Sequence, residues 1–414
     1  MKKQICLLLC TVLVLGVFSG CSGSTLKVGY AHFDITPPEG MQVTLGGDLT
    51  GTRGADVIYD RLPGMCLALT DSDDNTVLMY SLDLLYPGAT TGYIRSISKA
   101  TGVPENQILI NTTHCHYAPM PDLGKAPTNA GYMTMLKEWM IEAGKAALED
   151  RKEAKMYTAS VTVEKMNAVR NYLLADGSVV SAETGGTSAP IVGHLSEPDR
   201  EMQMIKFTRT GGQDILLMNW QGHHTATGKG INTQSATISG VERMRVQLLE
   251  EHNTLFVFFH GASGDVGSTS RIGSENKFYN YQDHYQYLAQ TAVSQQFKQA
   301  KTGKLQLKIN KAEAVGKGST KIGVNLYALS LGDVAFVLAP YEMFSSSGLA
   351  IKKDSPYDTT FISTVSMGYA GYIPDEKAHE YSFYEVDGSK FGKGAAESLA
   401  NDYISLLKDL KSRK

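Results

Sequence analysis

Histidines that follow short apolar runs are the residues of this sequence best suited to chemistry. The run at residues 107–111 leads into His114-Cys115-His116, and the run at 215–220 leads to His223. Residues two apart in an extended segment share a face, so both imidazoles of the H-x-H pair can reach one metal ion. His223 would add a third imidazole if the two runs end side by side. The pattern therefore indicates a metal site.

A carboxylate occupies the same kind of position farther along the chain. The run at 333–338 is followed by Tyr341-Glu342, and the run at 254–259 opens into His260 and the Gly264-Asp265-Val266 turn. Strand ends that meet at one edge of a sheet commonly form active sites. Three imidazoles, or two with a carboxylate, plus one open position are a catalytic zinc pattern. Each motif alone is equally compatible with a structural role, such as a surface glutamate or a tight turn.

Alternating strand and helix patterns must position these residues. The expected strands are residues 76–85, 107–111, 215–220, 254–259 and 333–338. The expected helices are residues 133–149, 241–251, 284–299 and 394–410. This alternation favours an α/β fold, a single large domain of mixed β-sheets flanked by helices. The Gly-rich stretch at 174–193 has little pattern, which is typical of a functional loop.

Composition narrows the classes of protein and of partner. The chain has 414 residues, of which 42% are hydrophobic and 20% charged, as in an ordinary globular protein. Lys and Arg total 39 against 42 for Asp and Glu, so the formal net charge is -3. Because no basic excess is available to neutralise a phosphate backbone, we expect no nucleic-acid partner. The sequence leaves the oligomeric state open.

The N-terminus has the features of a bacterial lipoprotein signal. Lys2 and Lys3 precede an apolar run at residues 5–18, which is too short to span a bilayer. The segment Phe18-Ser19-Gly20-Cys21 resembles a lipobox, whose cysteine is acylated and becomes the mature N-terminus. We therefore predict a signal peptide at 1–20, a lipidated tether at 21–25 and a folded domain at 26–414, anchored in the cell envelope through Cys21. A plain secretory signal with a chance cysteine is the alternative.

A series of short motifs extends along nearly the whole predicted domain, from Val28 to about Asn401. In order they are Val28-Gly29, Asp34-Ile35-Thr36-Pro37, Asp60-Arg61-Leu62, Thr113-His114-Cys115-His116-Tyr117-Ala118-Pro119, Asn219 to His223, Gly264-Asp265-Val266, Tyr341-Glu342, Gly371-Tyr372-Ile373-Pro374 and Tyr384-Glu385. The series resembles the neutral/alkaline ceramidase family, a group of zinc-dependent amidases. Each motif is short, but six or more in the family's order are hard to obtain by chance.

The resemblance implies a Zn²⁺ site and the residues around it. Carried over position by position, it makes the zinc ligands His114, His223, Glu342 and Tyr372. It also assigns three residues to the reacting group, namely His116, Arg170 and Tyr384. In this scheme His116 shuttles protons or polarises the substrate, and Tyr384 contacts the reacting carbonyl. We further expect Asp83 to orient a ligand imidazole; a capping aspartate at a strand end is the alternative.

The motifs also depart from those of the characterised ceramidases. Gly267 stands where these enzymes have a functional serine, and Ser268 lies one residue late. Tyr59 replaces a histidine before Asp60-Arg61-Leu62. We also expect the chain to lack the C-terminal immunoglobulin-like domain that these enzymes append. The metal site is therefore better supported than ceramide as the substrate.

The resemblance implies hydrolysis of an amide (N-acyl) bond by water activated on Zn²⁺. The substrate would be a ceramide-like lipid or another N-acyl compound, and Arg170, Tyr384 and His116 would face the developing oxyanion. Two alternatives stay open. The same site could hydrolyse an ester or a sugar-linked amide, or the chain could be a catalytically inactive, lipid-anchored binding protein, which Gly267 and Tyr59 favour.

Overall fold

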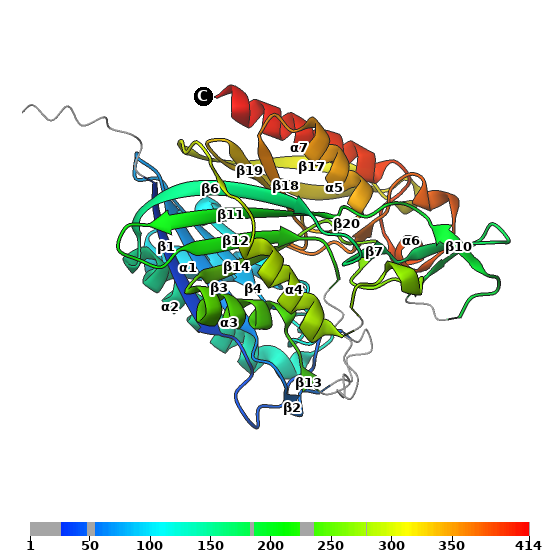
Figure 1. Cartoon of the computed structure of the whole chain (residues 1–414), viewed down its shortest axis with the longest axis horizontal. Coiled ribbons are helices and arrows are strands. Elements are labelled where there is room, and N and C mark those ends of the chain that lie inside the picture. The colour runs from blue at the N-terminus through cyan, green and yellow to red at the C-terminus, as the bar shows by residue number, and fades with distance from the viewer. Residues whose placement is uncertain (1–25, 48–53, 183–185, 224–235, 279, 414) are drawn as a thin grey trace, which may run out of the picture.

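Two larger β-sheets with helices on their outer sides form most of the described part of the chain, and smaller sheets accompany them (Figure 1). The computed structural model describes residues 26–47, 54–182, 186–223, 236–278 and 280–413. The predicted signal peptide at 1–20 and the lipidated tether at 21–25, with Cys21, lie outside these residues. The α/β fold with mixed sheets flanked by helices, predicted from the sequence, is confirmed.

The larger sheet has nine strands and is mixed. Its order is β14-β12-β11-β6-β1-β3-β4-β5, and β16 pairs with β6. The bounds are β1 Leu26–Asp34, β3 Pro63–Thr70, β4 Thr76–Leu82, β5 Ile108–Thr112, β6 Lys152–Thr162, β11 Glu201–Arg209, β12 Ile215–Trp220, β14 Leu255–His260 and β16 Lys298–Gln299. The pairs at the two ends of this order, β4–β5 and β12–β14, are parallel, and the other neighbours are antiparallel.

The sheet curls so that its two end strands lie against each other. The Asn111 side chain on β5 donates a hydrogen bond to the Phe258 carbonyl on β14 at 3.3 Å, and Ser81 on β4 donates to the same carbonyl. These side chains replace part of the backbone pairing that a closed sheet would have. The curl therefore brings together the carboxyl ends of β5, β12 and β14, which carry the histidine motifs.

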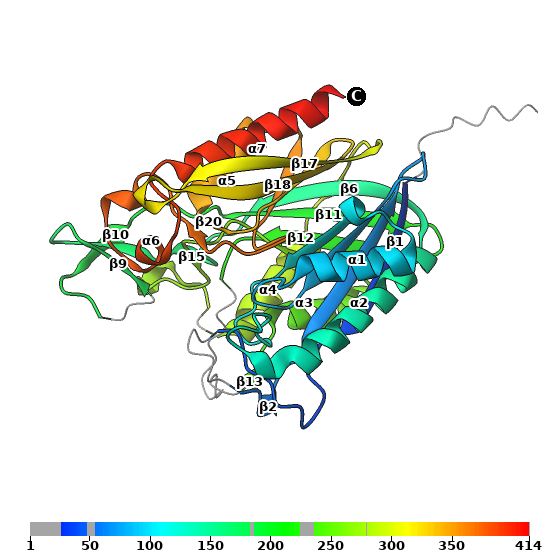
Figure 2. The same cartoon turned by 180° about the vertical axis from the view of Figure 1, so that it is seen from behind.

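The smaller sheet, β17-β18-β19-β21, packs on the larger one and has two apolar faces. Its strands are β17 Leu305–Val315, β18 Lys321–Leu331, β19 Val334–Leu338 and β21 Thr359–Ser363. Side chains alternate between the faces with the two-residue period of a strand. Phe336 and Leu338 join the core of the larger sheet, whereas Ala335 and Val337 pack toward α5 (Ser345–Asp354) and α7 (Ala395–Ser412). Both helices cover this sheet on the side of the molecule away from α1, α2 and α3 (Figures 1 and 2).

Two helix pairs cover the larger sheet, α1 (Thr90–Thr101) with α2 (Ala130–Glu149) and α3 (Gly240–His252) with α4 (Tyr281–Val293). Helix α2 lies close against β1 at Gly29, where an added Cβ would come within 1.9 Å of the Ala147 carbonyl oxygen. Helix α3 begins with an N-cap at Ser239, whose hydroxyl accepts a hydrogen bond from the Glu242 amide at 2.9 Å.

Small sheets border the candidate site. They are β2 (Val57–Ile58) with β13 (Ala236–Thr237), β7 (Ala168–Val169) with β15 (Val266–Gly267), β20 (Glu342–Met343) with β22 (Tyr372–Ile373), and β10 (Ile191–His194), β8 (Asn171–Leu174) and β9 (Val179–Ser181) in that order. The pairing of β20 with β22 aligns Glu342 with Tyr372. Helix α6 (Tyr384–Gly388) contacts β22.

The predicted elements agree with the structure except at two places. The five expected strands and four expected helices all occur, with ends shifted by a few residues. The helix expected at 284–299 was too long, because α4 ends at Val293 and Lys298–Gln299 pairs with β6 as β16. The stretch at 174–193 is also not a plain loop, since it contains β9 and the start of β10. Glycines there obscure the strand pattern, because they carry no side chain to alternate.

Neither a disulfide bond nor a membrane-spanning helix occurs among the described residues. Cys66 and Cys115 are both free and buried. Within the described ranges, the helices are too short or too polar to cross a membrane.

Candidate metal centre

The candidate site lies where strands from different parts of the sequence end together. His114 follows β5, His223 follows β12, and Glu342 begins β20 just after β19. Strands β5, β12 and β19 each pair in parallel with one neighbour, namely β4, β14 and β21. The carboxyl ends of parallel strands share one edge, so the side chains that follow them converge. All three side chains are buried.

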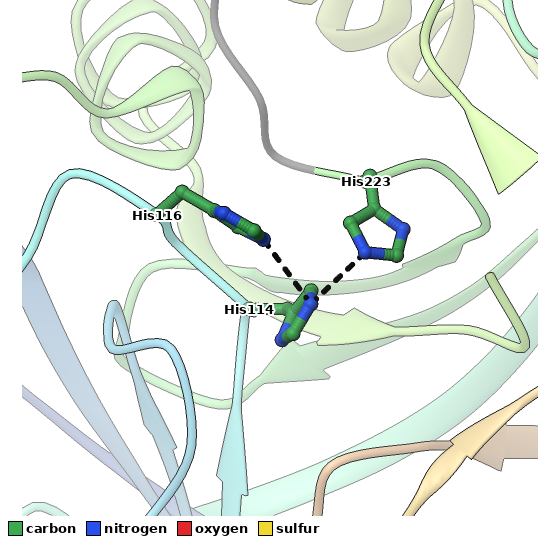
Figure 3. A group of neighbouring side chains, drawn as sticks. All are labelled: His114, His116 and His223. Atoms are coloured by element: carbon green, nitrogen blue, oxygen red, sulfur yellow. Dashed lines mark hydrogen bonds between the residues drawn. The ribbon is translucent and has the colours of Figure 1, made fainter. Parts of the chain in front are cut away.

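Three imidazole rings form the centre of this site (Figure 3). His114 lies between the other two, with its Nε2 atom 3.1 Å from His223 Nε2 and 3.3 Å from His116 Nε2. One ligand atom from each of the three histidines lies within 4.8 Å of the other two. His114 and His223 are buried, whereas His116 is partly exposed. The structure therefore brings together the three histidines that the sequence singled out.

Backbone carbonyls fix the tautomers of two of these rings. His114 Nδ1 lies 2.8 Å from the Leu85 carbonyl oxygen, and His223 Nδ1 lies 2.7 Å from the Ser263 carbonyl oxygen. A carbonyl oxygen only accepts, so both Nδ1 atoms carry the hydrogen. In the neutral imidazole the Nε2 atom then presents its lone pair to the centre of the site. Second partners of this kind are typical of metal-binding histidines.

The Glu342 carboxylate completes a set of acceptor atoms. Its Oε2 atom lies 3.3 Å from His114 Nε2 and 3.2 Å from His223 Nε2. Its Oε1 atom accepts a hydrogen bond from the Tyr369 hydroxyl at 2.7 Å. Burial opposes the negative charge, but His114 and His223 hold the pKa of Glu342 well below its usual range. The carboxylate is therefore ionised beside the two imidazoles.

Burial lowers the pKa of two histidines of the cluster, His223 and His116. Burial, together with the Arg170 charge, lowers the pKa of His223 to about 4. Burial and the adjacent His114 place the pKa of His116 well below the usual value. The Nε2 atoms of His114 and His223 and a carboxylate oxygen of Glu342 converge on one space, while both Nδ1 atoms face backbone carbonyls away from it. Such a donor set fits a divalent cation, and zinc prefers histidine nitrogen with carboxylate oxygen.

The backbone of His114 supports a functional interpretation of the site. Its φ is 61°, in the left-handed region that non-glycine residues seldom adopt. Hydrogen bonds on either side hold it there, from the Thr113 amide to the Leu82 carbonyl at 2.9 Å and from the Cys115 amide to the Leu84 carbonyl at 3.1 Å. Backbone strain that the surroundings maintain in this way is common at active sites.

Arg170 and Tyr372 lie on one side of the cluster as a bonded pair. The Arg170 guanidinium donates to the Tyr372 hydroxyl oxygen at 3.1 Å and to the Gly264 carbonyl at 3.2 Å. Its Nε atom forms an ion pair with Glu385 at 2.9 Å, and both partners are buried. Burial and then the Glu342 charge raise the pKa of Tyr372, whereas Arg170 lowers it. Arg170 therefore holds the oxygen that the resemblance assigns to the metal.

Tyr384 stands next to this pair at the start of α6. Its ring centroid is 5.8 Å from that of Tyr372, and the two rings are inclined by 70°. Tyr384 is half-buried. Each predicted reacting residue thus lies next to a predicted ligand, His116 beside His114, and Arg170 and Tyr384 beside Tyr372. Arg170 also belongs to a buried ion pair that the sequence did not indicate.

The segment that carries Tyr369 and Tyr372 is tied to the strands that carry the histidines. The Met367 amide donates to the Ile110 carbonyl on β5 at 2.8 Å, and the Thr364 amide donates to the His260 carbonyl on β14 at 2.9 Å. Val365 and Met367 have φ values of 50° and 63°. Left-handed backbone is a genuine outlier for a β-branched residue such as valine. The surrounding strands therefore impose one conformation on this segment.

The structure corrects the expectation for Asp83. This buried carboxylate accepts a hydrogen bond from the Thr113 hydroxyl, and burial raises its pKa to about 7. The Nδ1 atoms of His114 and His223 contact backbone carbonyls instead. Asp83 therefore orients neither imidazole and binds the strand end next to His114. A carbonyl partner leaves no signal in the sequence, which is why the prediction was wrong.

The turn that departs from the ceramidase motif has a defined arrangement. Gly267 pairs with Ala168 between β15 and β7, and an added Cβ would lie 3.4 Å from the Thr269 carbonyl oxygen, its nearest neighbour. The Ser268 hydroxyl donates to the His223 carbonyl at 2.8 Å. Ser268 is therefore bound to the backbone, and a Cβ at position 267 would make only ordinary van der Waals contacts.

Three neighbours of the site were not assigned roles from the sequence. Tyr369 contacts Glu342, Glu385 pairs with Arg170, and the His260 ring centroid lies 5.4 Å from that of His114. Their positions beside recognised motifs were the available signals. Tyr369 precedes Tyr372 in Gly-Tyr-Ala-Gly-Tyr, Glu385 follows Tyr384, and His260 ends a strand.

Solved structures share this fold. A ceramidase complexed with C2 matches with a TM-score of 0.74 over 94% of this chain and 76% of that chain, at 11% sequence identity. Neutral ceramidase from Pseudomonas aeruginosa matches with a TM-score of 0.72 over 94% of this chain and 75% of its own, at 12% identity. No family model and no curated protein sequence matches the chain. The chain thus has the fold of these ceramidases over nearly its whole length.

Proposed function

We propose that the chain is a zinc-dependent hydrolase that cleaves the amide bond of an N-acyl compound. One observation carries this proposal. Glu342 Oε2 lies within 3.3 Å of the Nε2 atoms of both His114 and His223, while both Nδ1 hydrogens are engaged elsewhere. The two Nε2 atoms and the carboxylate oxygen face one space, where a cation can be held between them. Two histidines and one glutamate are a recurring ligand set of catalytic zinc.

The residues around this set have distinct proposed roles. His114, His223, Glu342 and Tyr372 hold Zn²⁺, which when bound activates water and polarises a carbonyl. The partly exposed His116 accepts the proton of the attacking water at Nε2 and returns a proton to the leaving amine. Arg170 keeps the Tyr372 oxygen in place through the contact between their side chains. Tyr384, next to Tyr372, donates a hydrogen bond to the oxyanion that develops on the substrate.

The substrate class follows from the fold and the turn at Gly267. The ceramidase fold and the motif resemblance favour an N-acyl bond, in a ceramide-like lipid or another N-acyl compound. Gly267 stands where the ceramidases have a serine, so a substrate that does not need this hydroxyl is part of the proposal. An ester or a sugar-linked amide presents the same reacting carbonyl to the same residues.

The location of the chain is part of the proposal. We propose that it is a lipoprotein of the cell envelope, held to a membrane by an acyl group on Cys21. The support is the lipobox-like segment before Cys21 and the apolar run at residues 5–18. Labelling of the expressed full chain with a radioactive or clickable fatty acid tests this. Incorporation lost in the Cys21→Ala variant supports it, and incorporation by neither chain would contradict it.

A substrate panel tests the hydrolase proposal. Purified protein loaded with zinc is assayed on ceramides, N-acyl amino acids, N-acyl sugars and matched esters, beside its His114→Ala variant. Turnover of an N-acyl compound that stops on chelation, returns with zinc and is absent from the variant is the expected result. Bound zinc without turnover of any class would instead favour the catalytically inactive binding protein.

A further inference from the structure

Tyr369 is the residue of this site whose contact has no assigned role. Its hydroxyl reaches Glu342 Oε1 at 2.7 Å, although 43% of the residue is exposed. The other carboxylate oxygen, Oε2, faces His114 and His223. The two oxygens of Glu342 are thus divided between a hydroxyl donor and the imidazoles.

The ring of Tyr369 stacks on one neighbour and lines a cavity. It stacks on Tyr86, with ring centroids 4.4 Å apart and an interplanar angle of 8°. The two rings also line a cavity of about 710 Å³ together with Tyr93, Leu123 and Met133. Tyr86 itself is buried. The hydroxyl of Tyr369 therefore reaches Glu342 from a ring that is stacked on a buried neighbour.

The backbone before Tyr369 adds to this restraint. The amides of Val365, Ser366 and Met367 donate to the carbonyls of Tyr341, Ala339 and Ile110, at 3.3, 3.0 and 2.8 Å. Tyr341 and Ala339 lie between β19 and Glu342, and Ile110 belongs to the strand before His114. The segment therefore holds Tyr369 in register with the backbone of both Glu342 and His114.

We propose that Tyr369 is a positioning residue that selects which oxygen of Glu342 faces the metal. A carboxylate on a rotatable side chain can present either oxygen, or both, to a cation. A hydroxyl that occupies Oε1 leaves Oε2 as the single ligand atom directed at the space between the imidazoles. This inference rests on the proposed metal site and adds an outer partner of Glu342, as the Leu85 and Ser263 carbonyls are outer partners of the histidines.

Zinc affinity measures this role directly. Apo protein is titrated with zinc against a chromophoric chelator, for wild type and for Tyr369→Phe, which keeps the ring and its stack. Loss of an outer-shell hydrogen bond to a ligand typically weakens metal binding about 10- to 100-fold. We expect Tyr369→Phe to fall in this range. The thermal midpoint of the apo form should stay close to that of wild type.

Tyr93→Phe is the matched control. It removes a hydroxyl from the same cavity, but that hydroxyl contacts Met133 Sδ at 3.4 Å and not Glu342. Its zinc affinity should equal that of wild type. Tyr86→Leu removes the stacked ring while keeping the Tyr369 hydroxyl, so it should weaken zinc binding less than Tyr369→Phe does.

A double variant shows whether Tyr369 acts through Glu342. Adding Tyr369→Phe to Glu342→Ala should cause no further loss of zinc affinity, because the acceptor of the hydrogen bond is already gone. An equal loss in both backgrounds, or wild-type affinity in Tyr369→Phe, would overturn the inference. Failure of the wild-type protein itself to bind zinc would overturn the proposed function instead, so the two outcomes are distinguishable.

Discussion

Replacing Arg170 by methionine tests whether a buried ion pair holds the candidate site together. Arg170 and Glu385 are 3% and 0% exposed, with Arg170 Nε 2.9 Å from Glu385 Oε1. The same guanidinium binds the Tyr372 hydroxyl and the Gly264 carbonyl. Methionine keeps most of the aliphatic volume but provides none of these donors. The substitution leaves Glu385 charged and buried, with the Ser181 hydroxyl as a remaining donor at 3.1 Å.

The expected loss of stability is large because one charge stays behind. Removing one partner of a buried pair typically costs about 3–5 kcal/mol. That is roughly a hundred- to several-thousand-fold change in the folding equilibrium constant. Neutralising the remaining partner should recover part of the loss, so Arg170→Met with Glu385→Gln should be more stable than Arg170→Met alone. An interaction energy of about 1–3 kcal/mol between the two positions is expected.

Urea unfolding of the apo proteins, followed by circular dichroism, measures these free energies. The matched control is Arg61→Met, which removes a pair with Asp34 whose side chains are 69% and 36% exposed. This surface pair should contribute no more than about 1 kcal/mol. If Arg170→Met lowers the free energy of unfolding by as little as Arg61→Met does, the buried Arg170 charge does not stabilise Glu385. The account of how Tyr372 is positioned would then be wrong.

Four further predictions concern single side chains. His116→Ala should retain zinc while turnover falls about 10²–10⁴-fold, and loss of zinc in that variant would instead make His116 a ligand. The free energy of unfolding of Gly267→Ser should lie within about 0.5 kcal/mol of the wild-type value, since the nearest atom to an added Cβ is 3.4 Å away. Ser268→Ala should leave turnover within a few fold, because its hydroxyl contacts backbone; a large loss would assign Ser268 a reacting role. Burial raises the pKa of Asp83 from 3.8 to about 7, so the folded state holds a proton that the unfolded chain releases. Stability should therefore fall by about 1.4 kcal/mol per pH unit as pH rises through this window, and less steeply in Asp83→Asn; equal slopes in urea unfolding would contradict this.

The strands and their end motifs could be predicted from sequence because burial and polarity alternate locally. The run at 215–220 is strand β12, and the histidine after it reaches the site as expected. The curl of the larger sheet could not be predicted in this way. It depends on hydrogen bonds from Ser81 and Asn111 to the Phe258 carbonyl, which lies 177 and 147 residues farther along the chain.

The residues of the site could be recognised in the sequence, but the atoms that orient them could not. His114, His223 and Glu342 stand out by type and position, but the atoms that orient them are the Leu85 and Ser263 carbonyls and the Tyr369 hydroxyl. Every residue provides a backbone carbonyl, so the type of residue does not indicate which carbonyl will orient a histidine. The error on Asp83 has this origin. Distant pairing had the same effect at α4, where contact with β6 turns Lys298–Gln299 into a strand.

The metal content of the purified protein shows whether the histidine cluster binds zinc. Elemental analysis of the purified mature protein, grown in zinc-replete medium, is made beside the variants His114→Ala and His252→Ala. His252 is exposed at the end of α3, away from the cluster, so its variant controls for the loss of any histidine. We expect about one zinc ion per chain in wild type and in His252→Ala, and none in His114→Ala. No zinc in the wild-type protein, or equal zinc in all three, would contradict it.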